Sequence, residues 1–172
     1  MTSIVLLFLL LVLIILSGFL SGSETAITAT SKARILYKKK KGSKRAGYVL
    51  ELLDKKDNVI STLLLSNNLV NILASSLATA FFYDLFGVEG IFYATLIMTV
   101  VIVIFAEVLP KTYAINRPNR TALLISPIIY YLNKILFIFV FLINLIVRII
   151  FKKNDNDIKD KDLQSEEELK GV

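Results

Sequence analysis

The chain has 172 residues, of which 55% are hydrophobic, and its mean hydropathy is +0.68. Soluble globular domains do not sustain such values over several long runs, so the composition predicts an integral membrane protein. The absence of cysteine and histidine excludes disulfides, thiolate metal sites and the commonest general base, which leaves oxygen and amine chemistry. The net charge of +6 comes from basic residues beside hydrophobic segments, which indicates membrane topology and anionic lipid rather than nucleic acid as the partner.

Four hydrophobic segments follow one another, at residues 4–20, 59–82, 91–109 and 123–151. About 20 helical residues span the hydrocarbon core, so the second and third are complete spans, and the first becomes one if its helix continues past residue 20. A cleaved signal peptide is the alternative for the first segment, but it lacks a basic leader and residues 25–37 continue with a helical pattern. The sequence therefore predicts an all-α membrane protein with three transmembrane helices.

Positive charges predict the orientation of these helices. Ten Lys and Arg residues lie between Lys32 and Lys56, whereas the turn at residues 84–90 has none and carries Asp84 and Glu89. Cytoplasmic loops are enriched in basic residues, so the first loop is expected in the cytoplasm and the acidic turn outside. The protein is thus predicted to lie in the cell membrane with an extracellular N-terminus and a cytoplasmic C-terminus.

The fourth segment is long enough to cross, but a single crossing would place the basic cluster at residues 148–153 outside. Pro127 and Asn133 divide the segment into pieces that are too polar or too short for one lipid-exposed helix. We therefore expect a helical hairpin or an interfacial belt on the cytoplasmic side. Residues 38–53 mix basic and apolar residues as an amphipathic surface helix does, and they are expected to join this layer.

The end of the chain differs in composition from the rest. Residues 152–172 are charged and hydrophilic, and residues 165–170 resemble the capped start of a helix. The sequence thus predicts a transmembrane domain at residues 1–151, followed by a charged cytoplasmic segment that leads into a further domain absent from this chain.

The first span contains a polar octet at residues 17–24, with two Ser-Gly pairs and Glu24. Glycine loosens a helix and serine can bond its own backbone, so the helix could distort here and present oxygens inward. A carboxylate at this depth suggests function. The alternative is that the small residues let two helices pack closely.

The second and third spans carry polar residues of their own. Asn67, Asn71 and Ser75 follow one another at intervals of four, so they share one helix face. Glu107 precedes Pro110, whose ring frees a backbone carbonyl in the preceding turn. The alternatives are interhelical hydrogen bonds for the asparagines and an ion pair with Lys111 for Glu107.

Counted along the helices from the nearest cytoplasmic charges, the polar groups of the first two spans fall at a similar depth, in the inner half of the membrane. Glu107 joins them if Lys111 faces a watery vestibule and Arg117 marks the membrane boundary. Carboxylate, amide, hydroxyl and carbonyl oxygens suit a hard cation, and Mg²⁺ in particular accepts a compact set of such ligands. The spans are therefore expected to form one cation site.

At these residues the chain resembles the transmembrane domain of the CorC and cyclin M (CNNM) family of magnesium transporters. The motifs occur in the family's order and spacing: Ser17-Gly18, then Ser21 to Ala26, Ser66-Asn67 with Asn71, and Glu107 with Pro110-Lys111. The resemblance covers about residues 1–150. It implies a homodimer with three spanning helices per subunit, an extracellular N-terminus, cytoplasm-side juxtamembrane helices and a magnesium site.

By motif position the resemblance implies these site residues: Ser21, the backbone of Gly22, Asn67, Asn71 and Glu107, with Ser17 and Glu24 as further candidates. A pair of cystathionine-β-synthase domains usually follows in the family, and residues 152–172 would be only the lead-in to it.

The function expected from these features is magnesium transport, with efflux as the direction and sodium entry as a candidate driving force, both implied by the resemblance. The alternative is a membrane-embedded sensor or scaffold that binds the ion without moving it. An enzyme is not expected, because the spans lack histidine and show no Ser-Lys or paired-Asp arrangement.

Overall fold

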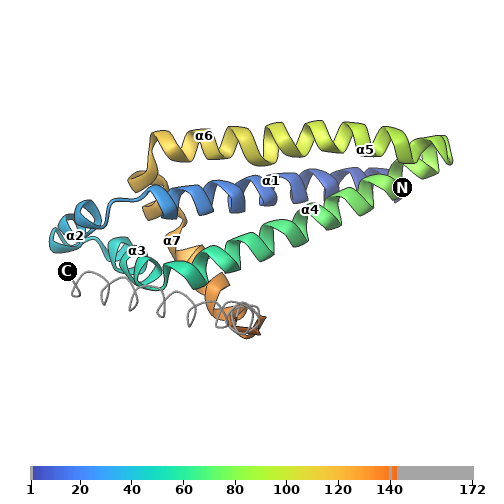
Figure 1. Cartoon of the computed structure of the whole chain (residues 1–172). Helices are drawn as coiled ribbons and strands as arrows, with labels where there is room; N and C mark the ends of the chain where they lie inside the picture. The colour runs from blue at the N-terminus through green and yellow to red at the C-terminus, as the bar shows by residue number, and fades with distance from the viewer. Residues whose placement is uncertain (1, 140, 143–172) are drawn as a thin grey trace, which may run out of the picture. The chain divides into compact units, whose positions relative to one another are not determined.

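The computed structural model describes residues 2–139, 141 and 142. Three helical stretches in this part of the chain are long and apolar enough to cross a membrane: Ile4–Ala29, Lys56–Phe86 and Glu89–Asn116. They lie side by side, and the short turn between the second and third is at the same end of the bundle as the N-terminus (Figure 1). The predicted all-α fold with three transmembrane helices is confirmed.

The first two spans are single helices, α1 (Thr2–Ala29) and α4 (Lys56–Phe86). The expected distortion of α1 at the polar octet is absent, since α1 runs without interruption through residues 17–24. The Ser23 hydroxyl donates to the carbonyl of Phe19, and Thr25, just after the octet, donates to the carbonyl of Ser21; bonds of this kind leave the helix intact.

The third span contains the irregular turn instead. It consists of α5 (Glu89–Val101), a π-helical segment η1 (Ile102–Val108) and α6 (Leu109–Asn116). Pro110 lies in the first turn of α6, where it has no N–H to donate to the carbonyl of Ala106. A wide π turn just before the proline accommodates this missing hydrogen bond within a continuous span.

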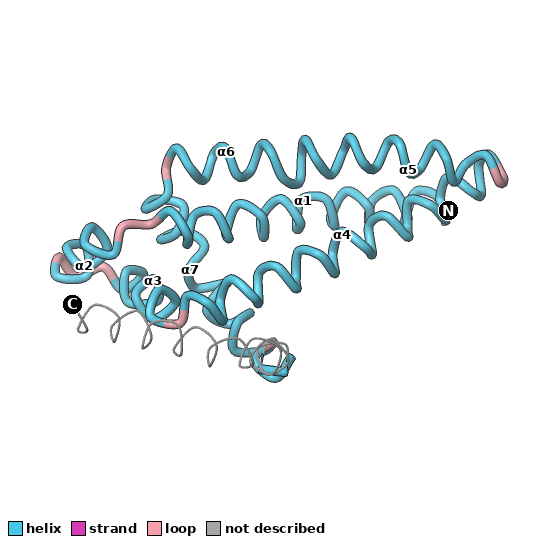
Figure 2. The backbone as a smooth tube through the Cα atoms, viewed as in Figure 1, coloured by secondary structure: helices cyan, strands magenta, loops and turns pink. Residues whose placement is uncertain are grey.

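Three shorter helices lie at the end of the bundle opposite the α4–α5 turn: α2 (Lys32–Lys40), α3 (Lys44–Asp54) and α7 (Pro118–Ile135). Figure 2 shows the short loops that separate α1, α2 and α3. The sequence predicted one helix at residues 25–37 and another at 38–53. The helices instead break at residues 30–31 and 41–43, where serine precedes each new helix and Gly42 has a positive φ of 87°.

Helix α7 forms part of the predicted belt. It packs against α1, α3 and α4. Its Ile125 and Ile129 are buried while Leu124 and Ile128 are exposed, so both of its sides are apolar, as a helix between protein and lipid requires. Asn133 Oδ1 lies 2.7 Å from Thr62 Oγ1 of α4, which satisfies a polar group that the sequence analysis treated as an interruption. Residues 143–172, including the rest of the predicted hairpin and the helix start at 165–170, lie outside the described residues.

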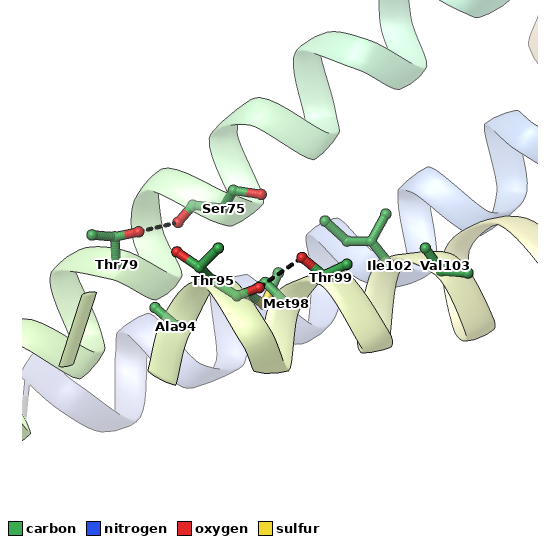
Figure 3. A pocket seen from close by; sticks show the side chains of 8 residues that line it. All are labelled: Ser75, Thr79, Ala94, Thr95, Met98, Thr99, Ile102 and Val103. Atoms are coloured by element: carbon green, nitrogen blue, oxygen red, sulfur yellow. Dashed lines mark hydrogen bonds between the residues drawn. The ribbon is translucent and has the colours of Figure 1, made fainter. Parts of the chain in front are cut away.

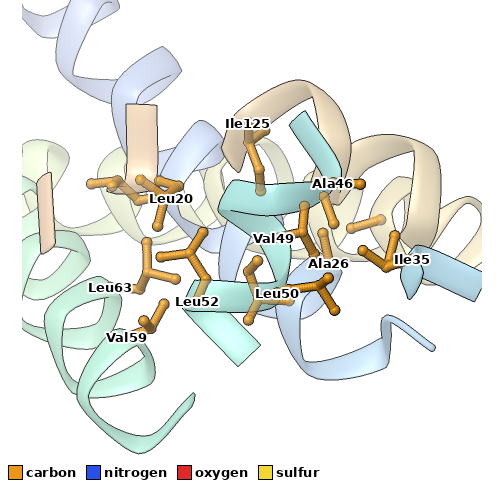
Figure 4. Packing of buried hydrophobic residues seen from close by; sticks show 14 of the residues in the cluster. Leu20, Ala26, Ile35, Ala46, Val49, Leu50, Leu52, Val59, Leu63 and Ile125 are labelled. Atoms are coloured by element: carbon orange, nitrogen blue, oxygen red, sulfur yellow. The ribbon is translucent and has the colours of Figure 1, made fainter. Parts of the chain in front are cut away.

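Most of the buried apolar side chains belong to one cluster where α1, α3, α4 and α7 meet (Figure 4). Val49 and Leu52 of α3 point into it beside Leu63 of α4 and Leu20 of α1. The cluster packs α3 and α7 against α1 and α4, next to the polar residues of these two spans and on the side toward α2. The depth and rotation of those two spans therefore depend on the belt.

A second, smaller cluster holds α1, α4 and α5 together nearer the α4–α5 turn. Ala74 and Ala78 of α4 are buried there against Leu10 and Met98. Helices α1 and α5 of the same chain thus cover these two alanines of α4. A homodimer stays a prediction from the resemblance.

The turn between α4 and α5 depends on Gly90. A Cβ at this position would lie 2.1 Å from the carbonyl oxygen of Phe82, so a side chain forces the two helices apart. We expect Gly90→Ala to lower the stability by about 1–3 kcal/mol, the range for overpacking. Gly47→Ala is the matched control, because a Cβ there meets nothing within 4 Å and alanine favours a helix by roughly 0.5–1 kcal/mol. Thermal unfolding in detergent measures both, and an unchanged midpoint for Gly90→Ala would contradict this account of the turn.

Candidate cation site

The centre of the site is a contact between the first two spans. Ser17 Oγ lies 2.8 Å from Asn67 Oδ1 and 2.6 Å from Asn71 Oδ1. Ser17 is 1% exposed, Asn67 is buried and Asn71 is half-buried. Ser17 thus meets two asparagines that are 50 and 54 residues later in the chain, near the middle of α1 and α4.

These three oxygens are not all satisfied by hydrogen bonds that Ser17 can make. Its hydroxyl has one hydrogen, so Ser17 can donate to one of the two asparagine oxygens and not to both. Either the other asparagine turns its amide so that the NH₂ group faces Ser17, or a cation is bound by all three oxygens. Three converging oxygens at these separations are a suitable set of neutral ligands for a small hard cation.

Ser21 extends this set along α1. It is four residues after Ser17, so both side chains lie on the same helix face. Its side chain is 0% exposed, and its Oγ has no hydrogen-bond partner in the described part of the chain. Ser23, which is equally buried, donates instead to the carbonyl of Phe19 at 2.6 Å. A buried hydroxyl without a hydrogen-bond partner costs about 1–3 kcal/mol, which makes Ser21 a candidate ligand.

Two glycines bring the third span close to the adjacent face of α1. A Cβ on Gly18 would lie 3.2 Å from the carbonyl oxygen of Phe105, and one on Gly22 would lie 3.3 Å from the carbonyl oxygen of Pro110. The backbone of the third span therefore runs against the polar octet. The sequence predicted a backbone role for Gly22 and, as the alternative for the octet, close helix packing by its small residues; the contacts at Gly18 and Gly22 agree with that packing.

Glu107 lies in the π-helical segment, next to Ala106, which is buried and close to Gly18. Its side chain is half-buried. No ion pair joins Glu107 to Lys111 among the residues that the structure describes, so the predicted alternative of a local ion pair is absent here. The structure also shows no hydrogen bond from Glu107 to Ser17 or the asparagines within that part of the chain. The backbone next to Glu107 thus lies close to Gly18 of α1, and the carboxylate makes no hydrogen bond to the oxygen cluster within the described residues.

Glu24 lies further away. It is seven residues after Ser17, about 10 Å along α1 toward the α2 end, and its side chain is half-buried. It therefore belongs to the approach to the cluster and not to its centre.

The chemistry of the site is that of neutral oxygens with a single nearby carboxylate. No group of three or more Asp, Glu, His or Cys side chains that could hold a metal ion occurs within the described ranges. A divalent ion here would keep part of its water shell, as Mg²⁺ commonly does, and would be held weakly enough to leave.

The similarity to known proteins extends over the part of the chain that holds these residues. The cyclin M transmembrane N-terminal domain family matches residues 8–172. The chain is 38% identical over 159 residues to the UPF0053 inner membrane protein YfjD of Escherichia coli, covering 91% of this chain and 37% of that protein. It is 35% identical over 167 residues to a UPF0053 protein of Haemophilus influenzae, covering 95% of this chain and 39% of that protein.

More distant relatives include a chloroplastic DUF21 domain-containing protein of Arabidopsis thaliana, 32% identical over 130 residues and covering 74% of this chain and 19% of that protein. The chain spans less than two fifths of the length of these curated relatives.

Proposed function

Because the chain belongs to the cyclin M transmembrane domain family, a transporter family associated with Mg²⁺, we propose that it moves magnesium ions across the membrane through the cluster around Ser17. The ligands are Ser17, Ser21, Asn67, Asn71 and Glu107, with the Gly22 backbone beside them and Glu24 on the approach. The chain is a homologue of an inner membrane protein and has three candidate spans.

The observation that carries this proposal is the contact of Ser17 Oγ with both asparagine oxygens, at 2.6 and 2.8 Å. One hydroxyl hydrogen serves at most one of these contacts. A cation would coordinate the three converging oxygens, and Ser21 would add a buried oxygen that has no hydrogen-bond partner in the described part of the chain. Glu107 would supply negative charge to offset the charge of the ion.

Flux in proteoliposomes tests the proposal. Vesicles that contain the chain and a fluorescent magnesium indicator are expected to take up or release Mg²⁺ when a gradient is imposed, and vesicles with Ser17→Ala are expected to show little flux. Ser23→Ala is the control, because its hydroxyl is bonded to its own helix. Equal flux in protein-containing and empty vesicles would reject transport by this chain.

A sensor or scaffold without transport is the second candidate, because the contacts of Ser17 with Asn67 and Asn71 would also hold α1 against α4 without any ion. The same vesicles separate the two candidates. Magnesium binding in titration calorimetry without flux would favour the sensor. A flux that depends on a sodium gradient would support sodium entry as the driving force, with efflux as the proposed direction.

The proposed topology has its own test. Single cysteines at Lys41, Glu89 and Lys153 are expected to react from the inside, the outside and the inside of the cell, respectively, with a reagent that does not cross membranes. The expectation rests on the basic loop at one end of the bundle and the acidic turn at the other. Lys153 is outside the described residues, and reaction there from the outside would mean that the fourth segment crosses the membrane.

A further inference from the structure

A groove between α4 and α5 is lined by hydroxyl groups that the Ser17 cluster does not use (Figure 3). Its volume is about 320 Å³, and it lies between Ser75 and Thr79 of α4 and Thr95 and Thr99 of α5. The other lining side chains are apolar. Four hydroxyls along one groove between two membrane-spanning helices form a polar strip in a region where the bilayer core offers no water.

The three threonine hydroxyls are oriented by their own helices. Thr79 donates to the carbonyl of Ser75 at 2.9 Å, Thr95 to that of Ile91 at 2.9 Å, and Thr99 to that of Thr95 at 2.7 Å. Each hydroxyl hydrogen is thereby committed to the backbone, and what remains free on each oxygen is its lone pairs. The groove therefore presents hydrogen-bond acceptors.

A hydrated cation is the ligand that matches such a surface. The waters around Mg²⁺ turn their oxygens to the ion and their hydrogens outward, so the complete ion is a donor in every direction, and Mg²⁺ gives up these waters reluctantly. Six waters occupy roughly 180 Å³ at about 30 Å³ each, so a hydrated ion fits within the groove. Neutral hydroxyls would hold it without trapping it.

The groove also lies along α4 between the asparagines and the α4–α5 turn. Ser75 and Thr79 follow Asn71 at intervals of four, so they extend the asparagine face by about 6 and 12 Å toward the α4–α5 turn. At that turn Asp84 and Glu89 are exposed carboxylates that would attract cations.

We propose that this groove is the path along which hydrated magnesium passes between the Ser17 cluster and the α4–α5 end of the bundle. The inference rests on the proposed transport function and adds the route. It predicts that the hydroxyls of the groove control the rate of flux and leave the affinity of the Ser17 cluster unchanged.

Two sets of variants test the route in vesicles containing the 172-residue chain. The chain has no cysteine, so a single introduced thiol reports one position. A charged methanethiosulfonate is expected to modify Thr99→Cys at least about tenfold faster than Leu96→Cys, because thiolates form in water and Leu96 is an exposed α5 residue outside the groove. Magnesium is expected to slow the reaction at position 99, and modification there is expected to block flux while calorimetric binding persists.

The second set removes hydroxyls without changing shape. Thr95→Val with Thr99→Val is expected to slow flux about fivefold or more, with unchanged binding. Thr112→Val is the control, since its hydroxyl makes the same kind of bond, to Val108 at 2.7 Å, away from the groove. Flux equal to that of the parent in the double variant would overturn the route.

Other occupants of the groove would also be visible. Equally slow modification at positions 96 and 99 would show a groove filled with lipid, and a disulfide between two Thr99→Cys chains as the main oxidised product would show that a second copy covers it. Either result overturns the route. Failure of the transport proposal looks different, because the parent chain itself would then show no flux.

Discussion

Glu107→Gln is expected to weaken magnesium binding by roughly fifty- to a hundredfold, which corresponds to about 2–3 kcal/mol for an interaction with a charged group. The substitution keeps the shape of the side chain and removes its charge. Glu107 is the one carboxylate inside the second and third spans, since Asp57, Asp84 and Glu89 lie at their ends. Asn71→Ala is the comparison, because it removes a neutral oxygen and leaves the charge. Its loss of affinity is expected to be smaller, about tenfold.

Titration calorimetry measures the affinity of both variants, and thermal unfolding without magnesium measures their stability. If Glu107 served only as a partner for Lys111, the glutamine variant would lose stability and keep its affinity. The absence of that ion pair from the described structure argues for the opposite pattern. Unchanged binding in both variants would remove the site assignment.

Ser21→Ala provides the second large expected effect, a loss of magnesium affinity of about tenfold with no loss of stability in the absence of the ion. The Ser21 hydroxyl is buried and has no partner in the part of the chain that the structure describes. Removing it therefore relieves a desolvation cost, and the ion-free protein is expected to be as stable as the parent or more stable by up to about 1 kcal/mol. This combination of weaker binding and retained stability is characteristic of a ligand. A residue needed for packing would show the reverse.

Ser23→Ala is the matched control for this prediction. Ser23 is also a buried serine of the same octet, but its hydroxyl already bonds to Phe19. Its replacement is expected to leave magnesium affinity unchanged. Equal effects of the two substitutions on affinity would mean that the octet acts through helix packing and that Ser21 is not a ligand.

Much of the fold could be predicted because its causes are local in sequence. The lengths of the apolar runs led to three spanning helices, and α4 and the third span extend beyond the predicted 59–82 and 91–109 by only a few residues at most ends. The helix boundaries near the basic loop were wrong. Breaks at residues 30–31 and 41–43 depend on how α2 and α3 fold back onto the core, which a pattern of basic and apolar residues does not specify.

The polar residues of the candidate site could be named from the sequence, but their contacts could not. Polar residues in an apolar span stand out in any sequence, so Ser17, Asn67 and Asn71 could be named without a structure. Which oxygen meets which depends on the rotation of α1 against α4. The expected distortion at residues 17–24 was wrong because serine and threonine hydroxyls can bond within a regular helix, whereas Pro110 cannot, and so the irregular turn is in η1.

The sequence by itself determined that this chain has three helices able to span a membrane, that basic residues gather at one end and acidic residues at the other, and that side-chain oxygens lie inside the spans, because hydropathy and charge act over a few neighbouring residues. Only the tertiary structure decided that Ser17 contacts both asparagines, that Ser21 has no partner among the described residues, and that Gly18 and Gly22 admit the backbone around Pro110. These outcomes depend on how whole helices rotate and pack against one another, and that packing is set by buried side chains far apart in the chain.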